Sequence, residues 1–225
     1  MRPAGEVAGA PAAVSQLYSE RADTYQRFIR SLGYPRGLRA VFMKSPALGP
    51  GLRILDAGCG TGVTTLALRS ALEARGMPAC AVDAFDLTPA MLSRFRATLA
   101  ASGIKDVRLA QADVLQLGSL PPAWSDYDLV VSAAALEYVP RSSLSAALRA
   151  LRGRLRASGT LLLFITRSNF LMRPLIERRW SANLYSRAEI SAALKRAGFS
   201  AHSFGHFPLP YRYLDAWGHV VEARG

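Results

Sequence analysis

Residues 54–62, ILDAGCGTG, place three glycines within five residues directly after a short apolar segment. Glycine has no Cβ, so it adopts positive φ angles and allows a ligand to approach the backbone closely. At a junction between a strand and a helix, such a turn directs backbone N–H groups and a helix N-terminus toward a nucleotide-like ligand. The spacing Asp56-x-Gly58-x-Gly60-x-Gly62 differs from the GxGxxG pattern of dinucleotide-binding folds. A tight turn without a ligand would also use glycines, so the interpretation depends on the residues further along the chain.

Strand and helix patterns alternate after this stretch. Apolar segments predict strands at 53–58, 78–87, 106–113, 127–136 and 159–167, and helical apolar spacing predicts helices at 64–75, 88–102 and 142–156. This order is typical of an α/β fold with a doubly wound, Rossmann-like, mostly parallel sheet and helices on both faces. Beyond a helix at 186–198, strand-like segments at 199–205 and 217–224 are joined without a helix, which favours an antiparallel pair. We therefore expect a seven-stranded sheet whose last strand is antiparallel.

Acidic residues stand at the ends of three successive predicted strands. Asp56 belongs to the first strand, Asp86 follows Gly62 by 24 residues, and Asp113 ends the third strand. An acidic group in the position of Asp86 can accept hydrogen bonds from both hydroxyls of a ribose. Asp113 can accept a hydrogen bond from an adenine amino group. Each residue alone also fits a cap or a surface charge, but together they predict a ligand with a cationic end, a ribose and an amino-bearing base.

The net charge of +12 is unevenly distributed along the 225 residues, because residues 141–196 carry 12 basic and 2 acidic side chains. One interpretation is an arginine-rich, solvated surface, and the other is a positive field that attracts an anionic substrate or a membrane surface. The apolar runs are too short to cross a bilayer, and the N-terminus lacks a signal-peptide core. Cys59 and Cys80 show no metal or disulfide spacing. We expect a soluble, cytoplasmic protein without a metal.

The expected organisation is a disordered tail at 1–14 and one domain at 15–225. Within this domain, 15–50 are expected to form a helical arm over the active site. Residues 167–185 interleave apolar and basic side chains, which predicts a lid or substrate insertion over an apolar or acidic substrate. A helix lying at a membrane surface or packed on the sheet edge would show the same pattern.

The segments ILDAGCGTG, FDLTPAML, QADVLQL and YDLVVSAAALEYV resemble, in order and spacing, the class I S-adenosylmethionine-dependent methyltransferase family. The resemblance covers about residues 50–167. The N-terminal LYSERADTYQRF (17–28) is similar to the opening of small-molecule members, including the group that methylates ubiquinone precursors. The implied cofactor is S-adenosyl-L-methionine, with S-adenosyl-L-homocysteine as the product.

Carried over by position, the resemblance assigns most of the cofactor contacts to the strand ends. It implies a methionine subsite formed by Asp56, Gly58, Cys59, Gly60, Thr61 and Gly62, with Asp86 as the ribose ligand. Leu87 and Met91 would flank the base, and Asp113 and Val114 would contact the adenine. Ser132 and Leu136 would line the methyl-donor side, and Tyr18 or Tyr25 would cover it.

Three residues are candidates for catalysis. Glu137 fits a general base or a ligand for a cationic substrate group, Tyr138 fits a substrate-orienting role, and His206 lies in a loop that can reach the crevice. Their structural alternatives are a carboxylate at a helix start, a packed ring and a structural histidine. Small-molecule members often carry a histidine pair after the fourth strand, and this chain has Glu137 and Tyr138 there, so no histidine role carries over to that position.

The function expected from the resemblance is methyl transfer, by in-line displacement, to an oxygen or nitrogen atom of a small molecule in secondary or cofactor metabolism. A phospholipid N-methyltransferase acting at a membrane surface is one alternative, with peripheral membrane contact through the basic segment. A non-catalytic cofactor-binding protein is another. A nucleic-acid partner is not expected, because SAAALEYV replaces the Asn/Asp-Pro-Pro-aromatic signature of base-amino enzymes. A dehydrogenase is disfavoured by the glycine spacing.

Overall fold

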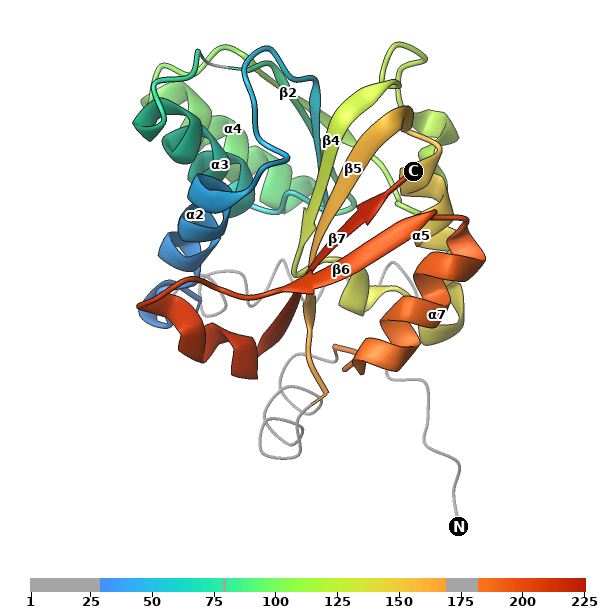
Figure 1. The fold of residues 1–225 in the computed structure, drawn as a ribbon. Coiled ribbons are helices and arrows are strands. Elements are labelled where there is room, and N and C mark those ends of the chain that lie inside the picture. Colours follow the sequence, from blue (N-terminus) through green and yellow to red (C-terminus); the bar gives the residue numbers. More distant parts are fainter. Residues whose placement is uncertain (1–28, 79, 169–181) are drawn as a thin grey trace.

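The computed structural model describes residues 29–78, 80–168 and 182–225 as an α/β fold around one sheet (Figure 1). The seven strands are β1 (Ile54–Ala57), β2 (Val82–Asp86), β3 (Val107–Gln111), β4 (Tyr127–Ala133), β5 (Leu155–Thr166), β6 (Ala201–Gly205) and β7 (Gly218–Arg224). Their spatial order is β3-β2-β1-β4-β5-β7-β6. Strands β1 to β5 pair in parallel, and β7 pairs antiparallel with both β5 and β6. The predicted fold class, including the antiparallel last strand, is confirmed.

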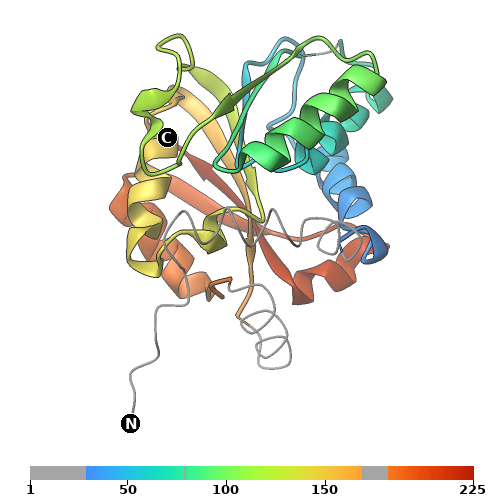
Figure 2. The same cartoon turned by 180° about the vertical axis from the view of Figure 1, so that it is seen from behind.

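Helices cover both faces of the sheet, as the views from the front and from behind show (Figure 2). One face carries α2 (Tyr34–Lys44), α3 (Val63–Ala74) and α4 (Pro89–Ala101), and the other carries α5 (Leu144–Arg152) and α7 (Arg187–Ala197). Short 3-10 turns complete the fold: η1 (Leu117–Ser119), η2 (Leu136–Tyr138), η3 (Arg141–Ser143) and η4 (Tyr211–Ala216). Because successive side chains of a strand point to opposite faces, Ile54 packs with the α2–α3 side and Leu55 with the α5–α7 side.

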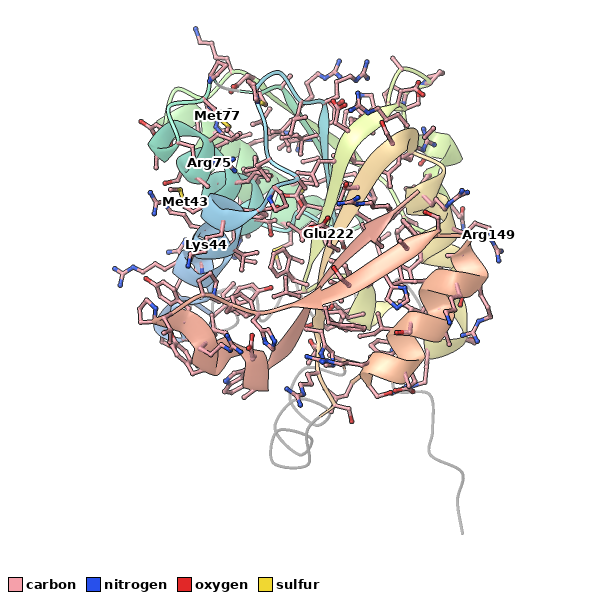
Figure 3. All side chains as sticks on the ribbon, viewed as in Figure 1. Met43, Lys44, Arg75, Met77, Arg149 and Glu222 are labelled. Carbon is pink, nitrogen blue, oxygen red and sulfur yellow. The ribbon has the colours of Figure 1, made fainter. Side chains whose placement is uncertain are left out.

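Local sequence chemistry sets the helix ends. Ser186 caps α7 through a capping box, in which its hydroxyl accepts from the Glu189 N–H and the Glu189 carboxylate accepts from the Ser186 N–H at 2.8 Å. Gly198, with φ of +92°, ends the same helix. At the end of α3, Arg75 donates to the carbonyls of Phe42 and Ser45 at 3.3 and 3.1 Å, which ties it to the end of α2 (Figure 3).

Several element boundaries differ from the sequence expectations; β2, for example, begins at Val82 rather than at residue 78, and α5 ends at Arg152 rather than at residue 156. The fourth strand ends at Ala133 rather than at residue 136, because Ala134 adopts a φ of +52° that turns the chain out of the sheet. The fifth strand begins at Leu155 rather than at residue 159, because Leu155 pairs with Tyr127 across a register shift. The apolar run 127–136 gave no signal of the turn, since a small apolar residue with positive φ looks like strand.

The predicted tail at 1–14, the first part of the predicted arm and residues 169–181 of the predicted lid lie outside the described residues. The described part of the arm contains α2. In the described ranges, no helix has the length and apolar character needed to cross a membrane.

We expect Gly62→Ala to destabilise the protein by about 2–5 kcal/mol in urea unfolding. Gly62 has a φ of +88°, and a Cβ there would lie 2.1 Å from the Phe95 ring, so positive-φ strain of about 1–2 kcal/mol adds to an overpacking cost of about 1–3 kcal/mol. Gly76→Ala is the matched control. Gly76 has a φ of +66° with nothing within 4 Å of a Cβ, so only the strain remains. Equal losses in the two variants would contradict the contact with Phe95.

Candidate functional site

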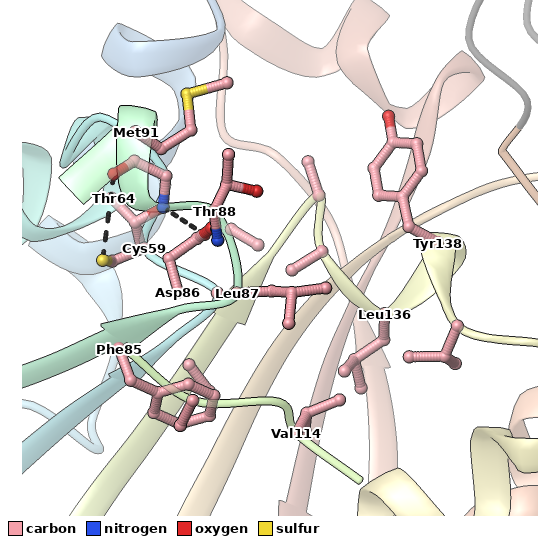
Figure 4. A pocket seen from close by; sticks show the side chains of 18 of the residues that line it. Cys59, Thr64, Phe85, Asp86, Leu87, Thr88, Met91, Val114, Leu136 and Tyr138 are labelled. Carbon is pink, nitrogen blue, oxygen red and sulfur yellow. Dashed lines mark hydrogen bonds between the residues drawn. The ribbon is translucent and has the colours of Figure 1, made fainter. Parts of the chain in front are cut away.

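A cavity lies at the carboxyl ends of β1 to β4, where parallel strands bring their ends to one edge of the sheet (Figure 4). Eleven of the residues predicted for the site line it: Gly58, Cys59, Gly60, Thr61, Asp86, Leu87, Met91, Asp113, Val114, Leu136 and Tyr138. Figure 4 shows Asp86 and Leu87 on one side of the space and Leu136 and Tyr138 on the other. Segments that are far apart in the chain therefore form one site.

The glycine turn presents its backbone to this cavity. The N–H groups of Gly58 and Cys59 both donate to the Phe85 carbonyl at 2.9 Å, which fixes the turn against β2. Gly60 has a φ of +53°, and a Cβ built there meets no heavy atom of the described residues within 4 Å. At Gly58 a Cβ would lie 2.4 Å from the Ala135 side chain. Gly58 therefore permits close packing within the protein, whereas Gly60 leaves open space beside the backbone.

Asp86 links the turn that follows β1 to the turn that follows β2. One carboxylate oxygen accepts from the Gly60 N–H and the other from the Thr88 N–H, both at 2.8 Å. Burial raises the pKa of Asp86 above its usual value, and the two N–H groups oppose this shift. Each oxygen of a carboxylate has two acceptor positions, and the Thr88 side chain also hydrogen-bonds to this carboxylate, so part of its acceptor capacity is left for a ligand.

Asp113 lies at the end of β3 in the same cavity. Its Oδ1 accepts from the Leu115 N–H at 2.9 Å, which orients the carboxylate within its own turn. Val114 and Leu115 line the cavity next to it. The corner therefore combines a fixed polar acceptor with apolar walls, which suits a flat heterocycle with an amino group.

Three predicted residues lie behind the cavity rather than in its lining. Ser132 is fully buried, and its hydroxyl donates to the Ala57 carbonyl at 2.9 Å, so it links β4 to β1. Gly62 begins α3 and packs against Phe95.

The third residue, Asp56, is buried on β1. Its Oδ2 accepts from the Thr65 hydroxyl at 2.5 Å, and its Oδ1 has no hydrogen-bond partner among the described residues. Burial, with a smaller contribution from the nearby Asp86, raises the pKa of Asp56 to about 7, although the hydrogen bond from Thr65 opposes the shift. A cation bound in the cavity would relieve both effects.

Glu137 faces a second cavity that adjoins the first and shares Ile29, Tyr34, Ala134 and Tyr138 with it. Glu137 is buried, with 1% of its surface exposed. Its Oε1 accepts a short hydrogen bond from the Thr166 hydroxyl, and its Oε2 is buried without a partner in the described part of the chain. Burial raises the pKa of Glu137 to about 7.

His206 is not brought to either cavity. His206 lies with Nδ1 2.7 Å from the Asp215 carboxylate, which also accepts from the Phe207 N–H at 2.9 Å, and it lines neither cavity. Tyr18 and Tyr25 lie outside the described residues.

Other lining residues were not identified from the sequence. They include Thr64, Thr88, Tyr34, Ala134 and Ala135. The two alanines enter the cavity because the turn at Ala134 bends the chain away from β4. Tyr34 follows Gly33, whose φ of +67° starts α2, and a glycine before an aromatic helix start was the available signal. In the described ranges, no group of three or more His, Cys, Asp or Glu side chains is arranged to hold a metal ion.

Comparisons with known proteins agree with this geometry. Residues 54–159 match a family model described as a methyltransferase domain. No curated protein matches the sequence. Magnesium protoporphyrin IX methyltransferase (ChlM) from Synechocystis PCC 6803, solved with bound SAM, is similar over 100% of both chains, with a TM-score of 0.70 and 18% identity.

Two further solved structures share the fold. The S-adenosylmethionine-dependent methyltransferase SibL has a TM-score of 0.63 and 23% identity over 83% of this chain and 54% of its own. YcgJ from Bacillus subtilis has a TM-score of 0.65 and 16% identity over 83% of this chain and 97% of its own. The chain thus spans about half the length of SibL and nearly the whole of YcgJ. The strand order and the glycine turn thus agree with the methyltransferase domain whose model matches residues 54–159, and the chain has the fold of these solved S-adenosylmethionine-dependent methyltransferases.

Proposed function

We propose that the cavity at the ends of β1 to β4 binds S-adenosylmethionine and that the protein transfers a methyl group to an oxygen or nitrogen atom of a small molecule. The observation that carries the proposal is the pairing of Gly60 with Asp86, which sets an open stretch of backbone beside an oriented carboxylate. A nucleoside with a flexible, charged tail needs both features at one place.

The residues of the cavity fit such a cofactor. The remaining acceptor positions of Asp86 suit two ribose hydroxyls, and Asp113 with Val114 suits an adenine ring and its amino group. Asp56 offers an unpartnered buried oxygen to which the ammonium of the methionine tail would be electrostatically complementary. A bound cofactor of this kind supplies an activated methyl group on a sulfonium sulfur.

The protein's own contribution is then to align the acceptor, exclude water and hold a proton. Tyr34, Ala134 and Tyr138 lie where the two cavities meet, so they bound the space through which an acceptor atom reaches the first cavity. Glu137 is the candidate general base, because a carboxyl with a pKa of about 7 is ionised near neutral pH and still accepts a proton efficiently. Transfer to a hydroxyl is therefore expected to increase as the pH rises through about 7 and to level off above that value.

We expect Asp86→Asn to weaken binding of S-adenosylhomocysteine by about 10- to 100-fold in calorimetry. The substitution keeps a carbonyl oxygen for one N–H but removes the negative charge from the ribose site, and hydrogen bonds to a charged group contribute about 1.5–3 kcal/mol. Asp106→Asn is the matched control, because Asp106 precedes β3 at the opposite edge of the sheet and pairs with Arg69 at 2.5 Å. Unchanged affinity in Asp86→Asn would remove the ribose assignment.

We expect the stability difference between Glu137→Gln and the wild type to depend on pH. Burial raises the pKa of Glu137 from 4.5 to about 7, so between these values the folded protein holds a proton that the unfolded chain has released. The contribution of this carboxyl to stability is therefore present below pH 4.5 and is lost as the pH rises through 7. Glutamine does not titrate, so the variant gains up to roughly 3 kcal/mol relative to the wild type between pH 4.5 and 8.

The measurement is urea unfolding of both proteins across this pH range. The groups around Glu137 are Thr166, Tyr185, Tyr138 and His219; burial raises the pKa of Tyr185 to about 12 and lowers that of His219. Glu189→Gln provides a control of opposite sign. Burial alone would raise the pKa of Glu189, but hydrogen bonds from Ser186 and the nearby Arg141 lower it overall. The contribution of Glu189 to the free energy of unfolding is therefore lost as the pH falls. A flat pH profile for the Glu137→Gln difference would exclude the raised pKa and, with it, the proposed base.

A further inference from the structure

The second cavity lies beside the first, between the ends of β5 and β7, the turn η2 and the loop that carries η4. Its shared boundary with the first cavity is formed by Ile29, Tyr34, Ala134 and Tyr138. A methyl acceptor must occupy a space that opens on the methyl donor, so this adjacency meets the first geometric requirement of an acceptor site.

Most of the lining is apolar and much of it is aromatic. Tyr34, Phe164, Phe207 and Trp217 contribute rings, and Leu32 and Leu214 add aliphatic surface. Phe207 packs against both Tyr34 and Phe164, with ring centroids 6.2 and 6.0 Å apart. Aromatic walls favour a flat apolar molecule, because the rings can stack on its faces. The rings already hold one another in place, so binding orders them little further.

The outer wall of this cavity is held in place by specific contacts. The Tyr213 hydroxyl donates to the Leu32 carbonyl at 2.7 Å, which joins η4 to the chain just before α2. A Cβ at Gly37 would lie 2.3 Å from Leu214, so α2 and η4 pack closely. The Asp215 carboxylate accepts from the Phe207 N–H and from His206. His206, predicted as a catalytic candidate, thus contacts the loop that carries one of the aromatic walls.

The polar content of the lining is small and points to one kind of ligand group. Glu137 brings a buried Oε2 without a partner in the described ranges, while its Oε1 is occupied by Thr166. Asn183 fixes this turn, since its side chain donates to the carbonyls of Glu137 and Val139 at 3.1 and 2.8 Å. A buried acceptor that lacks a donor costs about 1–3 kcal/mol, so a ligand that supplies a donor there gains affinity.

The charges of the described lining disfavour an anionic ligand group. No Lys or Arg is among the described residues that line the second cavity, so a carboxylate or phosphate would be buried without a counter-charge. An ammonium would be attracted by the Glu137 carboxylate and by the aromatic faces, but burying a charge costs far more than burying a hydroxyl, so an amine is the competing ligand that the test below separates. A hydroxyl has a single hydrogen to donate, and the unpartnered Oε2 can accept it.

We propose that the second cavity binds the methyl acceptor, and that the acceptor is an uncharged, flat, apolar molecule whose hydroxyl group donates to Glu137. This inference rests on the proposed methyltransferase function and deepens it. In the reaction the hydroxyl proton passes to Glu137 Oε2 as the oxygen forms its bond to the methyl carbon; the carbon–sulfur bond breaks, and its electron pair stays on the sulfur.

The test uses three naphthalene probes that differ in one substituent: 2-naphthol, 2-naphthoate and 2-naphthylmethylamine. Calorimetry on the full chain saturated with S-adenosylhomocysteine is expected to show binding of 2-naphthol and at least tenfold weaker binding of the other two. Glu137→Gln is expected to weaken 2-naphthol binding about tenfold, because the amide presents an N–H or a weaker acceptor to the hydroxyl. Trp217→Ala is expected to weaken all three probes, because it removes one aromatic wall.

The affinity for S-adenosylhomocysteine reports separately on folding and on the proposed function. Both variants are expected to keep it, since neither residue lines the first cavity. Glu222→Gln on β7 is the matched control, because Glu222 pairs across from Leu162 and lies outside the second cavity (Figure 3). If the wild type fails to bind S-adenosylhomocysteine, the proposed function fails. If it binds this nucleoside but prefers 2-naphthoate or 2-naphthylmethylamine, binds no probe at millimolar concentration, or is unaffected by Glu137→Gln, the acceptor inference is overturned.

Discussion

The hydrogen bonds from Gly60 and Thr88 to the Asp86 carboxylate organise the site. They join the turn after β1 to the start of α4, and they orient an acidic group at the sheet edge before any ligand arrives. Hydrogen bonds to a charged acceptor are stronger than those between neutral groups, so this connection holds two loops that the sheet alone would leave independent. One carboxylate therefore has a structural task and, in the proposed function, a ligand-binding task as well.

Two further carboxyls are buried with one oxygen each unpartnered within the described residues, Asp56 beside the first cavity and Glu137 in the second. Burial raises both pKa values to about 7. In each case a neighbouring hydroxyl, from Thr65 or from Thr166, satisfies the other oxygen. The same local arrangement thus occurs once for each proposed ligand, and in both places the protein carries a destabilising polar group that a ligand donor would relieve.

The sequence predicts the parts of the site that backbone chemistry dictates. Gly58, Gly60 and Asp86 were identifiable because positive φ angles and strand-end carboxylates leave a pattern in the chain. The turn at Ala134 left none, since three successive alanines are compatible with a strand, and it is this turn that places Glu137 in a separate cavity. Ser132 was predicted on the methyl-donor side, yet its hydroxyl links β4 to β1. Which face of a buried strand a residue occupies depends on register, and a fully apolar strand does not reveal its register.

Many of the arginines that give the chain its positive charge make structural hydrogen bonds. Arg53, Arg75, Arg141, Arg149, Arg154 and Arg167 each donate to at least one backbone carbonyl far along the chain. Arg154, for example, joins the carbonyls of Trp124 and Leu117 at 2.9 and 2.5 Å. A planar group with five N–H donors can serve two carbonyls at once, which lysine does less well. These arginine contacts lie at loops and helix ends, and the described lining of both cavities contains neither Lys nor Arg, in agreement with the proposed uncharged acceptor.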